Sequence, residues 1–447
     1  MKKVLSIIMV MALCLSIAFA GGSKEADDNG LEKGVVTKPT ATEDPQLKKT
    51  VKILSIWSED NDNGVLITGI LDQYKAEVNP NFDYEYELVS SNDLKQKVTT
   101  LAASKDLPDL FVYESGKPIL ELIEADAIMD VGEIAEAFDC YDSLSPSAVS
   151  LLKTLSGTDE LYDLPLGMNV EGFWYNKALF EQAGVEVPET WDEFEEVLAK
   201  LQAAGIQPLS AGGSDKWGVT RIMNGYLVRT AGADAMQKAA DGVTKYTDPE
   251  YVAAAQKLQD WGNKGYFGKG VTTVDMNTAG SMVMTGKSAV FYNGSWFTSN
   301  LNNPDENLAG PDGIGFFNVP VVDPAISDAL SYSMNCGNII CVGKDRYDEA
   351  TGWMLKYFIE NMGDFAMLTQ GSVKGYTYSV SNDDVSSYTK LVLDELDKAQ
   401  SAFTWYEATM GSEVSTVAQN NVQPLVTGDM TAEEYMAKIQ SAHNLQN

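Results

Sequence analysis

Short apolar runs alternate with amphipathic helical segments near the start of the chain, and this alternation restricts the fold more than any other feature. Helices that follow strands in this way are typical of a largely parallel sheet covered by helices on both faces. The sequence therefore predicts an α/β fold. The strands are predicted over residues 51–57, 83–89 and 108–113, and the helices over 66–78, 94–102 and 119–128.

The same texture returns after a loop-rich stretch around residues 146–165. A helix is predicted over 177–183, and Gly184 suits the positive φ of its C-terminus. Another begins at Thr190, whose hydroxyl can accept from the Glu193 amide in a capping box. The remaining elements are predicted as a helix over 249–264, a strand over 287–292, helices over 347–368 and 387–399, and a last helix capped by Thr431.

The first twenty residues have the pattern of a secretory signal. Lysines precede an apolar run over 4–19, and the small residues within 18–20 fit a cleavage site. The run is shorter than the roughly 20 apolar residues that a membrane-spanning helix needs. Cleavage before Cys14 with acylation there is the alternative, although Leu13 is bulkier than lipoprotein sites normally tolerate. We expect an exported protein, in the periplasm or at the cell surface, with the lipid anchor left open.

Length and charge limit the function classes. A chain of 447 residues exceeds the size at which one hydrophobic core usually stops growing, so two or more lobes are expected. Asp and Glu number 64 against 32 Lys and Arg, and the resulting net charge of −32 repels phosphate backbones and anionic lipid. We therefore expect no nucleic-acid partner. Residues 21–49 are polar, contain Pro and Gly, and are interpreted as a flexible tether.

Four cysteines and one histidine exclude several kinds of site. If Cys14 leaves with the signal, the odd number that remains leaves at least one free thiol. Cys140, Cys336, Cys341 and His443 cannot form a standard zinc cage, and the lone histidine argues against the usual Ser-His-Asp and Cys-His chemistry. The cysteines are interpreted as small buried hydrophobes, and neither a metal nor another cofactor is expected.

Several stretches together resemble the large family of extracellular solute-binding proteins that bind sugars for ABC importers, which includes maltose-binding protein. Each stretch is weak alone, but their order and spacing fit the family over about residues 50–440. The stretches are 53–57, 97–109, 175–177 with the run around ThrTrpAspGluPhe at 190–194, 286–291 with the turn 293–296, and 405–406.

The resemblance implies two α/β lobes that are joined by crossing segments and close like a hinge over a ligand. Lobe one is expected over 50–168 and 323–376, and lobe two over 169–322 and 377–447. The implied function is capture of a carbohydrate, an oligosaccharide, and its delivery to the membrane permease subunits of an ABC transporter. We expect a monomer without enzymatic activity.

Sugar chemistry indicates which side chains could hold such a ligand. A pyranose stacks its C–H faces on aromatic rings, and its hydroxyls pair with carboxylates and amides. By resemblance, Trp296 after the turn that begins at Asn293 is the stacking residue of lobe two, and Trp405 is a late aromatic platform. Asp215 and Trp217 lie in a glycine-bordered loop that matches a ligand-contacting loop of the family. The alternative for each tryptophan is a purely structural role, in which the ring packs in the hydrophobic core.

Further candidates lie at strand ends, where open α/β sheets place ligands. Tyr113 and Glu114 end one predicted strand, and Glu59 follows another, although either carboxylate could be a solvated turn residue. Asn169 lies at the first crossing, where the family's maltose binder has an acidic group, and Glu171 competes for that role. An amide at this position puts maltose itself in doubt. Trp57 and Trp191 are assigned to packing.

The alternative function is an exported glycoside hydrolase, because aromatic platforms beside paired carboxylates also describe such sites. Nothing in the sequence singles out a catalytic pair among the 64 acidic residues. The series of eight strand–helix units expected of a barrel enzyme is also missing. A surface adhesin would be expected to show a repeat, and no repeat period is visible. We therefore expect no catalytic residues.

Overall fold

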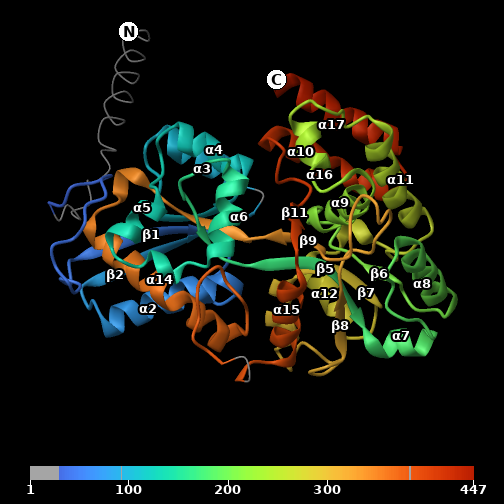
Figure 1. Cartoon of the computed structure of the whole chain (residues 1–447), viewed down its shortest axis with the longest axis horizontal. Helices are drawn as coiled ribbons and strands as arrows, with labels where there is room; N and C mark the ends of the chain where they lie inside the picture. Colours follow the sequence, from blue (N-terminus) through green and yellow to red (C-terminus); the bar gives the residue numbers. More distant parts are fainter. Residues whose placement is uncertain (1–29, 92, 382–383, 447) are drawn as a thin grey trace, which may run out of the picture.

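The computed structural model describes residues 30–91, 93–381 and 384–446. It forms two lobes that lie side by side, each with its own β-sheet and its own hydrophobic core (Figure 1). The predicted signal, with Cys14, lies outside the described residues. Within the described part of the chain, no helix combines the length and the apolar character needed to cross a membrane.

The first lobe contains β1 (Lys49–Ser55), α2 (Asp62–Glu77), β2 (Phe82–Leu88), α3 (Leu94–Ala103), β3 (Leu110–Glu114), α4 (Lys117–Glu124), α5 (Val131–Ala137), the 3-10 helix η1 (Tyr141–Ser143), α6 (Pro146–Ser156), β4 (Leu164–Pro165), β10 (Asn338–Val342), η4 (Lys344–Arg346) and α14 (Glu349–Gln370). Its strand order is β2-β1-β3-β10-β4. β1 runs parallel to both β2 and β3, whereas β10 is antiparallel to β3 and β4. The predicted parallel arrangement is confirmed for the first three strands.

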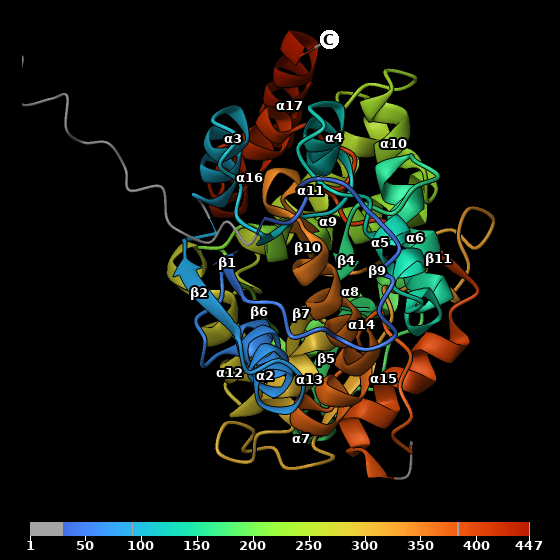
Figure 2. The ribbon, with the colours of Figure 1, turned by 90° about the vertical axis from the view of Figure 1, so that its left-hand side faces the viewer.

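Helices cover both faces of the first sheet. α2 and α14 lie together on one side, and α3, α4 and α6 lie on the other (Figure 2). The apolar face of α2, which includes Leu66 and Ile70, is buried in the first core. A Cβ at Gly69 would lie 2.5 Å from the Phe365 ring of α14, so the missing side chain lets the two helices approach closely.

The second lobe contains β5 (Asn169–Asn176), α7 (Lys177–Ala183), α8 (Trp191–Ala203), β6 (Leu209–Ser210), α9 (Trp217–Ala231), α10 (Ala235–Ala240), α11 (Pro249–Asn263), η2 (Val271–Thr273), α12 (Met276–Met284), β7 (Val290–Gly294), η3 (Ser295–Phe297), α13 (Thr298–Leu301), β8 (Ile314–Phe317), β9 (Ser331–Asn335), α15 (Ser387–Lys398), β11 (Ser401–Phe403), α16 (Ser412–Thr427) and α17 (Ala432–Gln446). Its strand order is β11-β9-β5-β7-β6, and β8 also pairs with β5. β5 is antiparallel to β7, β8 and β9, whereas β11 runs parallel to β9 and β6 runs parallel to β7, so this sheet is mixed.

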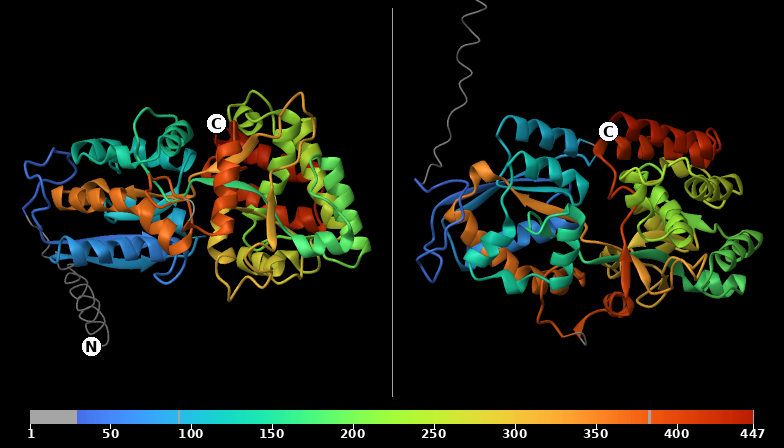
Figure 3. Two further views of the ribbon diagram at one scale, coloured as in Figure 1. Left: turned by 60° about the horizontal axis from the view of Figure 1, so that its bottom comes forward. Right: turned by 45° about the horizontal axis from the view of Figure 1, so that its top comes forward.

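The chain passes between the lobes from β4 to β5, again from β9 to β10, and again after α14 (Figure 3). The second passage differs from the expected boundary at residue 323. β9 pairs with β5 in the second sheet, so the chain passes from the second sheet to the first only between Asn335 and Asn338. Tyr332 and Met334 of β9 nevertheless pack into the first core.

The segment expected to be a tether lies against the first lobe along its described part. The Gly34 amide donates to the Tyr347 carbonyl over 2.9 Å, and Lys38 forms an ion pair with Asp139. Residues 30–48 therefore run along the lobe surface and do not stand clear of it.

The local signals within the lobes are confirmed. Thr190 and Glu193 form the capping box, and Gly184 has a φ of 63° at the end of α7. Trp191 is buried in the second core, in agreement with its assignment to packing. The three cysteines in the described part of the chain are free and buried, and burial raises the pKa of each thiol. They are Cys140, Cys336 and Cys341.

Candidate functional site

The crossing strand β5 carries two of the predicted polar residues, Asn169 and Glu171, into a buried position between the lobes. Asn169 Nδ2 donates to Asn335 Oδ1 of β9 over 3.1 Å, and Ser295 Oγ donates to Asn169 Oδ1 over 3.2 Å. Asn335 Nδ2 in turn donates to Glu171 Oε1. These side chains form a continuous polar chain across both crossing strands.

Arg221 of α9 completes this polar chain. Its Nη1 donates to Glu171 Oε1 over 2.7 Å, and its Nε lies 3.8 Å from Glu407 Oε2. Burial disfavours the charged guanidinium, but Glu171 and then Glu407 outweigh it, so the pKa of Arg221 is raised. Burial raises the pKa of Glu407, while Arg221 and a hydrogen bond from Thr220 oppose that rise. The arginine therefore stays charged among carboxylates.

Two predicted tryptophans, Trp217 and Trp405, lie beside this arginine, and a third, Trp296, packs against Trp217. We call these three residues the aromatic cluster. The ring centroids of Trp217 and Trp296 lie 6.0 Å apart at an interplanar angle of 55°. The Arg221 guanidinium carbon lies 4.5 Å from the Trp217 ring centroid and 5.8 Å from that of Trp405, within cation–π range. Trp217 and Trp296 are half-buried, so part of each indole stays open to solvent.

Local sequence explains how the two half-buried indoles are placed. Trp217 is the first residue of α9, and Arg221 follows at i+4, on the same face of the helix. A Cβ at Gly218 would lie 2.5 Å from Met276 Sδ, so this glycine leaves room for the Met276 side chain of α12 where α9 begins. A Cβ at Gly294 would lie 1.9 Å from the Trp296 ring, so that glycine lets the indole fold back onto the end of β7.

Two other predicted residues of this lobe are held by internal hydrogen bonds. Asp215 is exposed as a residue, but its Oδ2 accepts a hydrogen bond from the Met276 backbone amide at 2.7 Å. Partial loss of solvent around this carboxyl group raises its pKa. Asn293 is buried, and its Oδ1 accepts the Gly294 amide while its carbonyl accepts Trp174 Nε1. These bonds shape the start of α12 and the turn before Trp296.

The predicted residues of the first lobe are spread more widely. Tyr113 is buried in the first core, and burial raises its pKa. Glu59 is exposed in the turn after β1. Glu114 forms an ion pair with Lys95 at 2.8 Å. Burial is the largest cause of the raised pKa of Glu407 in the other lobe, and the charge of Glu114 raises that pKa further. Of these three residues, Glu114 is therefore the one whose charge acts on Glu407 of the second lobe.

The lobes meet beside Glu114. The Lys117 amide donates to the Ala408 carbonyl across the lobe boundary at 3.5 Å. Two buried atoms near this contact, Ser115 Oγ of the first lobe and Glu407 Oε2 of the second, have no hydrogen-bond partner among the described residues. Buried polar groups are normally paired, so these atoms indicate a place for a ligand or water.

A cavity of about 710 Å³ opens between the lobes, and we call it the interlobe cavity. Ser58, Asp60 and Asn61 of the β1–α2 turn line it from the first lobe, together with Gln370 at the end of α14. Helices α12 and α13 and the turn after α13 line it from the second lobe. Most of the lining side chains carry hydroxyl, amide or carboxylate groups.

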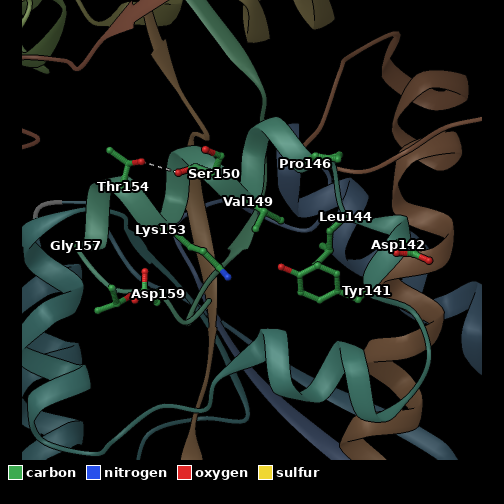
Figure 4. A pocket seen from close by; sticks show the side chains of 11 residues that line it. Tyr141, Asp142, Leu144, Pro146, Val149, Ser150, Lys153, Thr154, Gly157 and Asp159 are labelled. Carbon is green, nitrogen blue, oxygen red and sulfur yellow. Dashed lines mark hydrogen bonds between the residues drawn. The ribbon is translucent and has the colours of Figure 1, made fainter.

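A second hollow, of about 680 Å³, lies within the first lobe alone. Residues of η1, α6 and the turn after α6 line it, and Figure 4 shows the side chains of Tyr141 and Lys153 on facing sides of it. None of the predicted site residues borders this hollow. It carries neither the tryptophans nor a contribution from the second lobe.

Sequence reasoning missed Arg221, Glu407 and Asn335, although these residues join the predicted ones. Glu407 directly follows the pair Trp405–Tyr406, and that proximity was an available signal. Arg221 lies at i+4 from Trp217, but its helix was not predicted. Asn335 becomes a neighbour only through the pairing of β9 with β5, and no local pattern reveals that pairing.

Comparisons with known proteins agree with this architecture. The model of the bacterial extracellular solute-binding proteins matches residues 60–337. An ABC transporter extracellular-binding protein of Pyrococcus horikoshii is 24% identical over 319 residues, 68% of this chain and 69% of that protein. The multiple sugar-binding protein of Streptococcus mutans is 24% identical over 296 residues, 62% of this chain and 64% of that protein.

Solved structures show the same fold. A chitin oligosaccharide binding protein superposes with a TM-score of 0.80 at 24% identity, covering 89% of this chain and 98% of that one. A maltose-bound protein from T. maritima superposes with a TM-score of 0.73 at 19% identity, covering 89% of this chain and all of that one.

Proposed function

The chain belongs to the bacterial extracellular solute-binding proteins, and we propose that it captures a carbohydrate, an oligosaccharide, between its lobes and delivers it to an ABC transporter. Relatives in the family include a multiple sugar-binding protein and a xylose/arabinose-binding protein, and fold neighbours include a chitin oligosaccharide binding protein. These names support a sugar as the solute class.

One observation carries the proposal for this chain. Half-buried indoles of Trp217 and Trp296 meet beside the buried Glu171–Arg221 pair, next to the strands that join the lobes. Indole faces suit the C–H faces of a pyranose, and the neighbouring carboxylate and amide groups suit its hydroxyls. A site that combines apolar faces with a few placed polar groups is typical of small-molecule recognition.

We assign stacking to Trp296, Trp217 and Trp405, and hydrogen bonding to Glu114 and Glu59 at the face of the first lobe. The remaining predicted residues act by holding this surface in place, because Tyr113 is buried in the first core and the polar side-chain atoms of the other four are already bonded within the protein. These positioning residues are Tyr113, Asn169, Glu171, Asp215 and Asn293.

We further propose that the protein is a monomer and that it captures its ligand without catalysing a reaction. Hydrolysis of a glycoside requires one carboxylic acid and one free carboxylate on either side of the scissile bond. Arg221 instead lies between Glu171 and Glu407 and engages both carboxylates. The alternative of an exported glycoside hydrolase gains no support from this arrangement. Export and delivery to membrane permease subunits follow the family, and acylation of Cys14 stays a separate proposal.

A thermal-shift panel of neutral oligosaccharides tests the proposed function. A ligand at 100 times its Kd stabilises the folded protein by about 2.7 kcal/mol, so the right sugar should raise the melting temperature clearly. Chromatography after prolonged incubation should return that sugar intact. Conversion to shorter products would establish the hydrolase instead. If no sugar raises the melting temperature while an amino acid or a polyol does, the solute belongs to that other class and is not a sugar.

A further inference from the structure

We propose that Asn335 is a further positioning residue for sugar capture, because its carboxamide ties the turn of the second crossing to the Glu171–Arg221 pair. Through that pair it sets the place of Trp217 relative to the segments that cross between the lobes. The inference rests on the proposed function and adds regulation to it: a sugar on the aromatic cluster would favour one setting of those segments. In this role Asn335 does not itself contact the sugar.

The chain turns sharply where β9 ends and the second crossing begins. Gly337 has a φ of 71°, a conformation that glycine adopts more readily than other residues. Its amide donates to Asn335 Oδ1 over 2.7 Å, so the side chain of the last β9 residue stabilises the turn. A Cβ at Gly337 would lie 3.5 Å from Asn169 Nδ2 and 3.7 Å from the Gly167 amide nitrogen. The turn of the second crossing therefore lies directly beside the first crossing.

The Asn335 carboxamide uses its acceptor and its donor on different partners. Oδ1 accepts from the Gly337 amide and also from Asn169 Nδ2 over 3.1 Å. Nδ2 donates to Glu171 Oε1. A backbone amide can only donate and a carboxylate can only accept, so these partners fix which end of the carboxamide faces each of them. An ionised aspartate or an apolar side chain could not serve all three partners.

From Glu171 the contacts continue to the aromatic cluster. The oxygen atom of Glu171 that accepts from Asn335 also accepts from Arg221 Nη1 over 2.7 Å. The Arg221 guanidinium carbon in turn lies 4.5 Å from the Trp217 ring centroid. Successive contacts therefore connect the turn at Gly337 with the Trp217 ring.

Burial makes this connection costly to break. Asn335 is 4% exposed and Glu171 is fully buried, so water cannot readily replace a bond lost between them. If the turn at Gly337 changes as the lobes move, the Glu171–Arg221 pair must follow it or lose the hydrogen bond from Asn335. A sugar that holds Trp217 in one place then biases the turn, in proportion to how much better it binds that arrangement.

Calorimetric titration with maltotriose, xylotriose and chitotriose as probes tests this role. For a probe that binds the wild type, Asn335→Ala should weaken binding at least about tenfold, because Glu171 then loses a buried donor. Asn335→Asp should also weaken binding, since an acceptor replaces that donor. The exchange Asn335→Asp/Glu171→Gln places an amide donor and a carboxylate acceptor opposite each other again, and it should recover most of the affinity.

Asn176→Asp is the matched control. Asn176 is also 4% exposed and uses its carboxamide in the same two ways, because Oδ1 accepts the Leu179 amide and Nδ2 donates to the Val283 carbonyl. These partners all lie in the second lobe. The control should lose stability in urea denaturation but bind the probe like wild type. Small-angle scattering at saturating probe should show full contraction for the control and less contraction for Asn335→Ala.

The outcomes separate this role from the proposed function. If none of the probes binds the wild type, the proposed function fails for these neutral oligosaccharides and the role fails with it. Unchanged affinity in both Asn335→Ala and Asn335→Asp would overturn the role while the function stands. An equal loss of affinity in Asn176→Asp would also overturn it, because general destabilisation would then explain the effect. If the single Asn335 variants do not fold, the exchange decides: recovered folding and binding support the pairing, and no recovery overturns it.

Discussion

Arg221 and Glu171 form an ion pair of 2.7 Å that joins helix α9 of the aromatic cluster to the crossing strand β5. The Glu171 side chain is fully removed from solvent, and that of Arg221 is 16% exposed. Asn335 of the other crossing strand donates to the same carboxylate oxygen. The surface proposed to hold the sugar is thus attached to both strands about which the lobes would move.

Replacing Arg221 by Met should destabilise the protein by about 3 kcal/mol or more, because the buried Glu171 then loses its cation. The free energy of unfolding, measured by urea denaturation, reports this change. The double variant Arg221→Met/Glu171→Gln should recover much of the loss, since it leaves no uncompensated buried charge there. A double variant as unstable as the single one would show that packing of the arginine, and not its charge, is what matters.

Arg221→Lys separates charge from stacking. Lysine keeps the positive charge, but it lacks the planar guanidinium that lies over Trp217 and near Trp405. We expect most of the stability to remain while sugar affinity falls, because the indoles lose the group between them. Calorimetric affinity beside the urea midpoint measures both quantities. Unchanged affinity would remove Arg221 from the positioning of the aromatic cluster.

Ligand binding should close the lobes. Small-angle scattering should then give a smaller radius of gyration with saturating oligosaccharide than without it. Intrinsic fluorescence should change in parallel, because Trp217 and Trp296 are half-buried and would lose solvent on closure. Identical scattering profiles at saturation would argue against closure as the signal that the transporter recognises.

Stability should fall as pH rises because of Asp163 in the first lobe. This carboxyl is buried, and burial raises its pKa from 3.8 to about 7. Between about pH 4 and 7 the native protein therefore holds a proton that the unfolded chain has lost. The native state binds more protons in that window, so the free energy of unfolding decreases through it, by on the order of a few kcal/mol.

Asp163→Asn removes this titration and should flatten the profile of unfolding free energy between pH 4 and 7. Asp159→Asn, an exposed change in the preceding turn, is the control and should keep the wild-type slope. Parallel profiles for wild type and Asp163→Asn would show that the carboxyl is ionised without cost in the folded protein.

Most of the fold was predictable because local signals agree with the tertiary structure. The capping box at Thr190 and the C-terminal Gly184 fix α7 and α8, and the alternation over 51–128 gives the parallel strands of the first sheet. Helix α6 was missed within a stretch interpreted as loop-rich, although Pro146 suits a first helical turn. Glycines at 218 and 225 lower the helix propensity of α9 and hide it.

The site was less predictable than the fold. Trp217, Trp296 and Trp405 were identified from their types and from family resemblance, and the structure places Trp217 and Trp405 beside one arginine and Trp296 against Trp217. That arginine could not be singled out, because its partner Glu171 lies fifty positions away in the sequence. Pairing of β9 with β5, which supplies Asn335, is also a long-range event that no local pattern encodes.

The central claim is that a carbohydrate binds at the aromatic cluster, and titration of Trp296→Ala with the bound oligosaccharide tests it most directly. Truncating a stacking indole should cost about 2 kcal/mol or more of binding, with an unliganded melting temperature close to wild type, because the ring is already partly exposed. Trp191→Ala provides the comparison: this ring is buried, and its loss should cost about 3–5 kcal/mol of stability. If Trp296→Ala instead loses stability like Trp191→Ala and keeps its affinity for the sugar, Trp296 is a core residue and the proposed site is wrong.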